Sequence, residues 1–298
     1  MKNETYMNLD QSLLVKSSNS SIPKLISLPG TSVPSTVNDK RILRAHIARR
    51  YISGIGIEIG ALGTPLDLPP SAQAIYVDRL SLEDLRNEYP ELAHRELRSP
   101  DVIDDGEMLH KFDEGSLDFI IANHVLEHCE NLLGTLAVHA SKLRKGGRLF
   151  YAVPNRDFTF DRHRQVTPFE HLVEDFLDGS EKHRAAHYLE WATLVEGLKG
   201  VDAQARAAQL QQAKYSIHYH AWDAKALMRT LALGTEFINF PGFVAHFELN
   251  LHEIIACSFA QISVGAVPSD LNKASNPLCN HRQCCRHWLT MRHNNWHH

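Results

Sequence analysis

A short run of β-branched residues that ends in a glycine turn constrains the fold of this chain more than any other feature. Ile55, Ile57 and Ile59 suit a strand packed in a sheet. Gly60 and Gly63 follow at once, and because neither has a Cβ, the backbone can turn sharply and come close to a ligand. We therefore predict a buried strand, a glycine turn and a ligand site beyond it, with a simple packing turn as the alternative.

A second apolar run, residues 74–77, ends in Asp78, which is placed to accept hydrogen bonds from a ribose diol. The turn after Glu58 has the pattern G-x-x-G and lacks the further glycines that surround a dinucleotide pyrophosphate with backbone N–H groups. A ligand with an amino acid and an adenosine, but no phosphate, needs only one close backbone approach and an acid for its ammonium group. S-adenosylmethionine fits that description.

Composition is ordinary for a soluble globular enzyme, with 298 residues, 43% hydrophobic and 22% charged. The net charge of −4 argues against general nucleic-acid binding. No apolar run approaches the ~18–20 residues of a membrane span, and the first residues lack the apolar core of a signal peptide. Five cysteines do not suggest a disulfide framework. We expect a cytoplasmic protein and leave its oligomeric state open.

Strand-like and helix-like segments alternate over about 100 residues. Helices are expected at 38–51, at 82–89 with Ser81 as N-cap, at 132–143 with a stop at Lys145–Gly147, and at 227–233. Strands are expected at 99–106, 116–123, 148–153, 237–248 and 252–259. This rhythm predicts an α/β fold with a Rossmann-like, doubly wound, mostly parallel sheet, closed by an antiparallel last strand.

Three regions are expected around this sheet. Residues 1–37 form a disordered tail, and 38–262 form the main domain, in which 157–220 is a helical cap over the ligand-binding strand ends. Residues 263–298 form a Cys/His-rich tail. Its potential zinc ligands are irregularly spaced, which favours a tail without metal: Cys279, His281, Cys284, Cys285 and His287.

Several short motifs occur in order: EIGA at 58–61, YVDR at 76–79, DGE at 105–107, SLDF at 116–119, NHVLEH at 123–128 and LRKGG at 143–147. Together they resemble the class I S-adenosylmethionine-dependent methyltransferases over about residues 51–259. The subgroup that is most similar also carries a segment like TFDRHRQVTPFEH at 159–171, and is associated with bacterial surface-polysaccharide or glycan biosynthesis. The resemblance implies S-adenosylmethionine as cofactor.

The cofactor is expected across the first strand ends. Gly60 would approach it by backbone, Glu58 would orient the methionine end and Asp78 would hold the ribose. Asp105, with the Gly106 backbone, would read the adenine amine, and Asp104 is the less favoured choice. The whole predicted set is Glu58, Gly60, Ala61, Asp78, Arg79, Asp104, Asp105, Gly106 and Asn123.

Histidines near the expected cap are candidate general bases, because transfer to a hydroxyl needs removal of its proton and a histidine titrates near neutral pH. His171 is preferred, since Thr167 and Glu170 resemble a capping box that would fix the start of its helix. His220 is second and His124 third, and a packing role is the alternative for each. Candidate substrate-binding residues, which could equally form a solvated turn, are Asp161, Arg162 and Arg164.

His124, Glu127 and His128 also match the zinc-protease pattern H-x-x-E-H, but they directly follow a strand, so no metal is predicted. We expect O-methylation of a sugar or glycan precursor, with a small-molecule or glycan acceptor. One alternative is a nicotinamide-dependent dehydrogenase, which the missing G-x-G-x-x-G disfavours. The other is a non-catalytic module that binds a partner through its cap or tail.

Overall fold

The computed structural model describes residues 37–260 except 93 and 241. All described residues belong to one compact unit. The predicted tails, 1–37 and 263–298, lie outside the described residues except for Val37. None of the described helices is long and apolar enough to cross a membrane.

The described residues form a seven-stranded sheet of order β3-β2-β1-β4-β5-β7-β6. The strands are β1 Gly54–Ile59, β2 Ala72–Asp78, β3 Val102–Ile103, β4 Leu117–Asn123, β5 Leu143–Pro154, β6 Gly242–Leu249 and β7 Glu253–Ala260. Strands β1 to β5 pair in parallel, and β7 runs antiparallel to both β5 and β6. The predicted fold class is confirmed.

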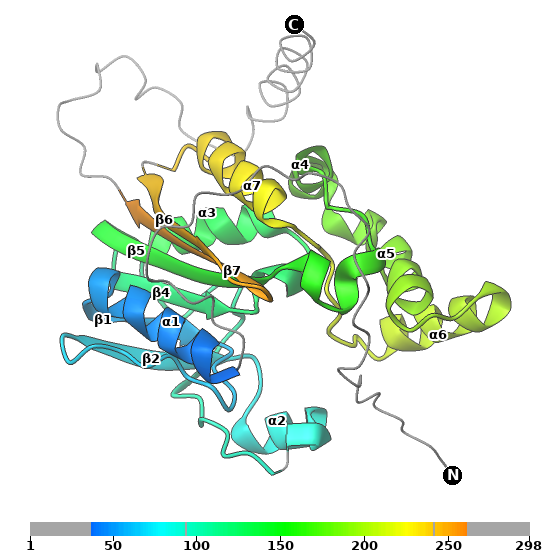
Figure 1. Cartoon of the computed structure of the whole chain (residues 1–298), viewed down its shortest axis with the longest axis horizontal. Helices are drawn as coiled ribbons and strands as arrows, with labels where there is room; N and C mark the ends of the chain where they lie inside the picture. The colour runs from blue at the N-terminus through cyan, green and yellow to red at the C-terminus, as the bar shows by residue number, and fades with distance from the viewer. Residues whose placement is uncertain (1–36, 93, 241, 261–298) are drawn as a thin grey trace, which may run out of the picture. The chain divides into compact units, whose positions relative to one another are not determined.

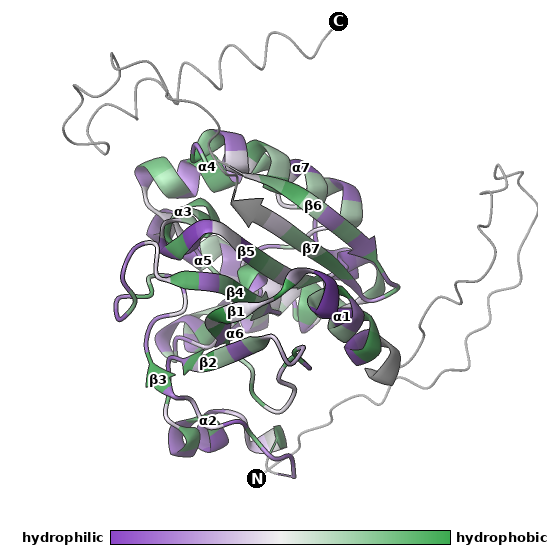
Figure 2. Ribbon diagram, turned by 90° about the vertical axis from the view of Figure 1, so that its left-hand side faces the viewer, coloured by the Kyte–Doolittle hydropathy of each residue, from purple (hydrophilic) through white to green (hydrophobic). Residues whose placement is uncertain are grey.

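Helices cover both faces of the sheet (Figure 1). Alternate residues of β4 face opposite sides: Ile120 joins a core with α3 and α7, whereas Ile121 packs with Ile47 of α1. Figure 2 shows the hydrophobic character of β1 and β4 that this double burial requires. The helices are α1 Val37–Tyr51, α2 Leu82–Glu88, α3 Leu132–Lys142, α4 Phe169–Asp178, α5 Arg184–Glu190, α6 Gly200–Gln212 and α7 Ala224–Phe237.

The segment between β5 and α7 has a small core of its own. Tyr188 of α5 and Leu210 of α6 pack together with Ile217, which lies on the chain returning toward α7. A π-helical turn, Trp191–Val195, follows α5, and Gly197, with a φ of 74°, precedes α6. Figure 1 shows α5 and α6 standing apart from the helices that flank the sheet. We call residues 157–220 the cap.

Some local predictions are confirmed and others are wrong. Ser81 caps α2 by accepting a hydrogen bond from Asp84 N. Ile55, predicted to be buried, is 55% exposed because it lies near the start of β1. The stop signal predicted at Lys145–Gly147 lies inside β5, since α3 already ends at Lys142.

The predicted capping box of α4 is also wrong. Pro168 is the N-cap, and no side chain caps this helix end. Thr167 pairs instead with Ala221: its Oγ1 accepts from Ala221 N at 3.0 Å, and its own N–H donates to Ala221 O at 2.9 Å. Long-range pairing with the returning chain therefore sets the start of α4.

Candidate active site

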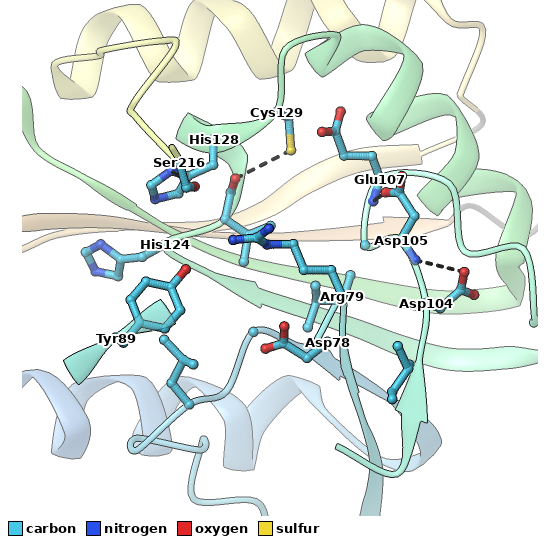
Figure 3. A pocket seen from close by; sticks show the side chains of 16 residues that line it. Asp78, Arg79, Tyr89, Asp104, Asp105, Glu107, His124, His128, Cys129 and Ser216 are labelled. Atoms are coloured by element: carbon cyan, nitrogen blue, oxygen red, sulfur yellow. Dashed lines mark hydrogen bonds between the residues drawn. The ribbon is translucent and has the colours of Figure 1, made fainter. Parts of the chain in front are cut away.

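A pocket of about 720 Å³ lies along the carboxyl ends of β1, β2, β3 and β4. Ligand pockets of proteins fall in this size range. Figure 3 shows Asp104, Asp105 and Glu107 on one side of the pocket, and His124, His128 and Ser216 on the other. Asp78 and Arg79 lie between these two groups (Figure 3).

The turn after β1 forms one wall of the pocket. Gly60 has a φ of 65°, a conformation that favours glycine, and a Cβ there would lie 3.4 Å from Val125 Cγ2. Glu58 does not line the pocket. Its two oxygens accept from Leu66 N at 3.0 and 3.1 Å, so it anchors the loop after the turn.

Burial of Glu58 raises its pKa to about 7. Asn123 Nδ2 lies 3.4 Å from Glu58 Oε1, and neither Asn123 nor Ala61 is among the pocket-lining residues. Three of the nine predicted cofactor residues, Glu58, Ala61 and Asn123, therefore lie outside the pocket lining.

Asp78 lies half-buried at the end of β2, and burial raises the pKa of its carboxyl group. Its Oδ1 accepts weakly from Leu80 N at 3.3 Å, which leaves acceptor capacity toward the pocket. The neighbouring Arg79 also lines the pocket, and its guanidinium pairs with Glu88 at 2.9 Å. This end of β2 offers the carboxylate that a ribose diol requires.

The loop after β3 places two adjacent carboxylates, those of Asp104 and Asp105, in different environments. Asp104 is buried and accepts from Asp105 N and Lys111 N, both at 2.8 Å. Burial alone would raise its pKa, but these backbone hydrogen bonds hold the pKa below its usual value. Asp105 is exposed, and among the described residues only its Oδ1 accepts a hydrogen bond, from Glu107 N at 2.8 Å. Asp105 is therefore the better placed of the two to bind a ligand.

Gly106 and Glu107 complete the pocket lining on this side. A Cβ on Gly106 would meet Ile59 Cγ2 at 2.6 Å, so glycine is needed for the loop to pack against β1. Glu107 was not predicted from the sequence. Burial raises its pKa to about 7, although Thr135 Oγ1 donates to it at 3.1 Å.

On the opposite side, His124 follows β4 with a φ of 56°. Its Nε2 lies 3.3 Å from Glu253 Oε2 and its Nδ1 3.4 Å from Glu127 Oε1. Burial lowers the pKa of His124, but the two carboxylates outweigh it and raise the pKa above its usual value. Arg44 of α1 pairs with the same Glu253. His124 thus sits in a charged network at the pocket wall.

His128 and Ser216 also line this side, and neither was predicted as a site residue. His128 Nδ1 lies 2.9 Å from Ile217 O, and because a carbonyl can only accept, Nδ1 carries the hydrogen. Burial lowers the pKa of His128 to about 4. At neutral pH the ring is therefore uncharged, with its lone pair on Nε2.

One group beside the pocket has the composition of a metal site. Ligand atoms of Glu127, His128 and His218 lie within 4.8 Å of one another. Glu127 Oε1 and His218 Nε2 are 4.0 Å apart, wider than the roughly 3.3 Å between ligands of a tetrahedral zinc ion. Burial would raise the pKa of Glu127, but the histidines around it hold the pKa at about 2. We therefore interpret Glu127 as a carboxylate paired with the surrounding histidines, and not as a metal ligand.

The other predicted functional residues lie outside the pocket lining. His171 and His220 belong to a cluster of histidines in the cap, with ring centroids 5.8 Å apart. Asp161 and Arg164 are buried and paired at 2.9 Å, and Arg164 also binds Glu190 at 2.9 Å. Arg162 is exposed and donates to His163 at 3.1 Å.

The sheet order, the antiparallel last strand and the pocket over the first strand ends define a class I methyltransferase architecture. The chain belongs to a family of methyltransferase domains, whose family model matches residues 45–231. It is a methyltransferase that uses S-adenosylmethionine. None of the curated proteins that were compared matches it.

Solved methyltransferase structures are similar at low identity. The CurJ carbon methyltransferase is 15% identical with a TM-score of 0.38, and the match covers 74% of this chain and 54% of that one. The Burkholderia thailandensis 1,6-didemethyltoxoflavin-N1-methyltransferase, with S-adenosylhomocysteine bound, is 15% identical with a TM-score of 0.39, and the match covers 74% and 76%. A methyltransferase from Aquifex aeolicus is 8% identical with a TM-score of 0.40 and coverage of 74% and 88%. Similarity this distant carries no argument about the methyl acceptor.

The pocket residues fit this cofactor. Gly60 offers close backbone approach, Asp78 a half-buried carboxylate and Asp105 a free acceptor oxygen, all on one cavity. Of the nine predicted cofactor residues, six line the pocket: Gly60, Asp78, Arg79, Asp104, Asp105 and Gly106.

Proposed function

We propose that this methyltransferase methylates a hydroxyl group of a sugar or glycan precursor. The observation that supports this most is the composition of the pocket side farthest from Asp105. There His128 and Ser216 present polar groups that can bond hydroxyls. The sequence resemblance to glycan-associated methyltransferases around residues 159–171 points to the same acceptor class.

Bound in this pocket, S-adenosylmethionine supplies an electrophilic methyl group on a sulfonium sulfur. The acceptor oxygen must lose its proton as it bonds to that carbon, while the carbon–sulfur bond breaks. We assign the proton to Nε2 of His128, because Nδ1–H is held by Ile217 O and the ring is uncharged at neutral pH. The carbonyl of Ile217 also stabilises the imidazolium that forms.

His124 has a different role in this proposal. Both its nitrogens face carboxylates, so its N–H groups are occupied there and His124 fixes the pocket wall. His171 and His220, the bases favoured by the sequence, lie off the pocket lining. They retain a catalytic role only if the cap closes further on the acceptor.

The acceptor is tested by incubating the full-length protein with methyl-labelled S-adenosylmethionine and panels of nucleotide sugars and oligosaccharides. Mass spectrometry with linkage analysis then locates the label. Label in a sugar methyl ether is the expected product. Label on nitrogen or carbon, with none on a sugar oxygen, would overturn the acceptor assignment but leave the methyltransferase class intact.

The base is tested with the acceptor so identified. His128→Ala should lower kcat by about 10²–10⁴-fold and leave the affinity for S-adenosylhomocysteine unchanged. His171→Ala and His220→Ala are the comparison variants. Normal turnover by His128→Ala, with loss in His171→Ala at unchanged stability, would return the role to His171.

A further inference from the structure

A second cluster of metal-ligating side chains lies in the cap, away from the pocket lining. Ligand atoms of His171, Asp175 and His187 lie within 4.8 Å of one another. His171 and Asp175 are one turn apart on α4, and His187 lies on α5. Two ligands at i and i+4 face the same side of a helix, which is a common spacing in zinc sites.

The distances match those around one small ion. His171 Nε2 is 3.1 Å from His187 Nε2 and 3.2 Å from Asp175 Oδ2. Four atoms bound tetrahedrally to zinc at 2.0–2.1 Å lie roughly 3.3 Å from one another. The cap cluster is therefore much closer to this geometry than the group around Glu127.

Two buried polar groups are left unsatisfied at the same place. Asp175 is 1% exposed, and no donor among the described residues is aligned for a hydrogen bond to its Oδ2. His220 is fully buried, and neither of its ring nitrogens has a hydrogen-bond partner in the described part of the chain. Its ring centroid lies 5.8 Å from those of His171 and His187. Unsatisfied buried polar groups are costly, and a cation bound beside His171 and His187 would satisfy Asp175 Oδ2.

A hydrogen bond from a neighbouring histidine orients the Asp175 carboxylate. Asp175 Oδ1 is held by His183 Nδ1 at 2.6 Å, which fixes the carboxylate and leaves Oδ2 directed at His171. Such partners of the ligands orient metal sites in proteins.

The geometry points to a zinc site in the cap, bound by His171, Asp175 and His187. Two imidazoles and one carboxylate suit zinc, and a site with three protein ligands keeps its fourth position for water. The ion would join α4 to α5. Tyr219 and His220, on the chain that returns from the cap, donate their backbone N–H groups to Glu127 O beside His128, which fixes this chain against the pocket wall.

Zinc binding is measured on the full-length chain carrying Cys279→Ser, Cys284→Ser and Cys285→Ser, which removes thiolate ligands in the tail. After treatment with a chelator, titration with zinc should give one bound ion per chain and a higher melting temperature. Cobalt in its place should give a tetrahedral spectrum. Absence of stoichiometric binding, or an octahedral cobalt spectrum, would overturn the site.

Variants in the same background locate the ion. Asp175→Asn and His187→Gln should lose it, and His183→Ala should weaken binding by about 10–100-fold. His128→Gln is the matched control, because His128 belongs to the other group of potential ligands and should leave zinc binding unchanged. Zinc lost in His128→Gln but kept in His187→Gln would contradict the assignment. Circular dichroism of each variant without metal confirms that it is folded.

Discussion

Asp104 and Asp105 are neighbours in the sequence with different tasks. Both oxygens of Asp104 accept from backbone N–H groups and shape its loop, whereas Asp105 uses Oδ1 for Glu107 N, which leaves Oδ2 as the oxygen that we expect to bind a ligand. The sequence alone favoured Asp105, but burial and hydrogen bonding supply the physical reason.

Asp105→Ala should therefore weaken binding of S-adenosylhomocysteine and reduce the preference over its inosine analogue by about tenfold. We expect this because, in the proposed binding mode, the Asp105 carboxylate accepts a hydrogen bond from the adenine amine, which inosine lacks. Calorimetric titration with both ligands measures the ratio. Asp113→Ala is the control, because Asp113 is exposed and lies outside the pocket lining. An unchanged ratio in Asp105→Ala would remove Asp105 from adenine recognition.

Several contacts of the site could not be predicted from local sequence patterns. Strand periodicity identified the strand that carries Glu58 but not the loop that its carboxylate binds. His128 and Ser216 meet across 88 residues of chain, a contact that no local pattern encodes. His171 faces α5 because of how the cap helices pack, and its neighbours in the sequence do not reveal this.

At the scale of elements, a buried arginine holds the cap together. Arg164 is 2% exposed and joins Asp161 to Glu190 of α5, while His218 Nδ1 lies 2.6 Å from the other oxygen of Asp161. Removing one partner of a buried ion pair leaves the remaining charges uncompensated.

Arg164→Met should accordingly lower the free energy of unfolding by about 3–5 kcal/mol. Arg206→Met is the matched control, since Arg206 pairs with Glu196 in the same cap but is 41% exposed, and its loss should cost within about 1 kcal/mol. Urea unfolding followed by fluorescence measures both. Equal, small effects of the two substitutions would show that the buried network does not stabilise the cap.

The order and type of the elements followed from the alternation of apolar strands and helices, since a parallel sheet covered on both faces needs nearly continuous apolar strands. Boundaries were less accurate where tertiary contacts decide them. Pairing of Leu143 with Leu117 of β4 extends β5 back to Leu143. Pairing of Thr167 with Ala221 sets the start of α4.

The stability of the whole molecule should fall in acid, because a buried histidine is neutral in the folded state. His139 is fully buried between Gly106 O and the Tyr151 hydroxyl, and burial lowers its pKa to about 4. The unfolded chain binds this proton near pH 6.5, so the stabilising contribution is complete above that pH and is lost as the pH falls toward 4.

His139 alone should make the protein about 2 kcal/mol less stable at pH 5 than at pH 7.5. His139→Gln should be less stable than the wild type at pH 7.5, because it disturbs two buried hydrogen bonds. Between pH 7.5 and pH 5, however, its free energy of unfolding should fall by about 2 kcal/mol less than that of the wild type. Urea unfolding at the two pH values gives the comparison, with exposed His46→Gln as control. The same pH dependence in His139→Gln and wild type would show that His139 is not the source.

We expect the pocket at the ends of β1 to β4 to bind S-adenosylmethionine. Calorimetric titration of the full-length protein with S-adenosylhomocysteine tests it directly. The wild type and Asp113→Ala should bind one molecule per chain, and Asp78→Ala should bind it more weakly by about 1–3 kcal/mol, because hydrogen bonds to the ribose diol are lost. Absence of binding by the wild type would show that the pocket does not hold this cofactor, and wild-type affinity in Asp78→Ala would remove Asp78 from the site.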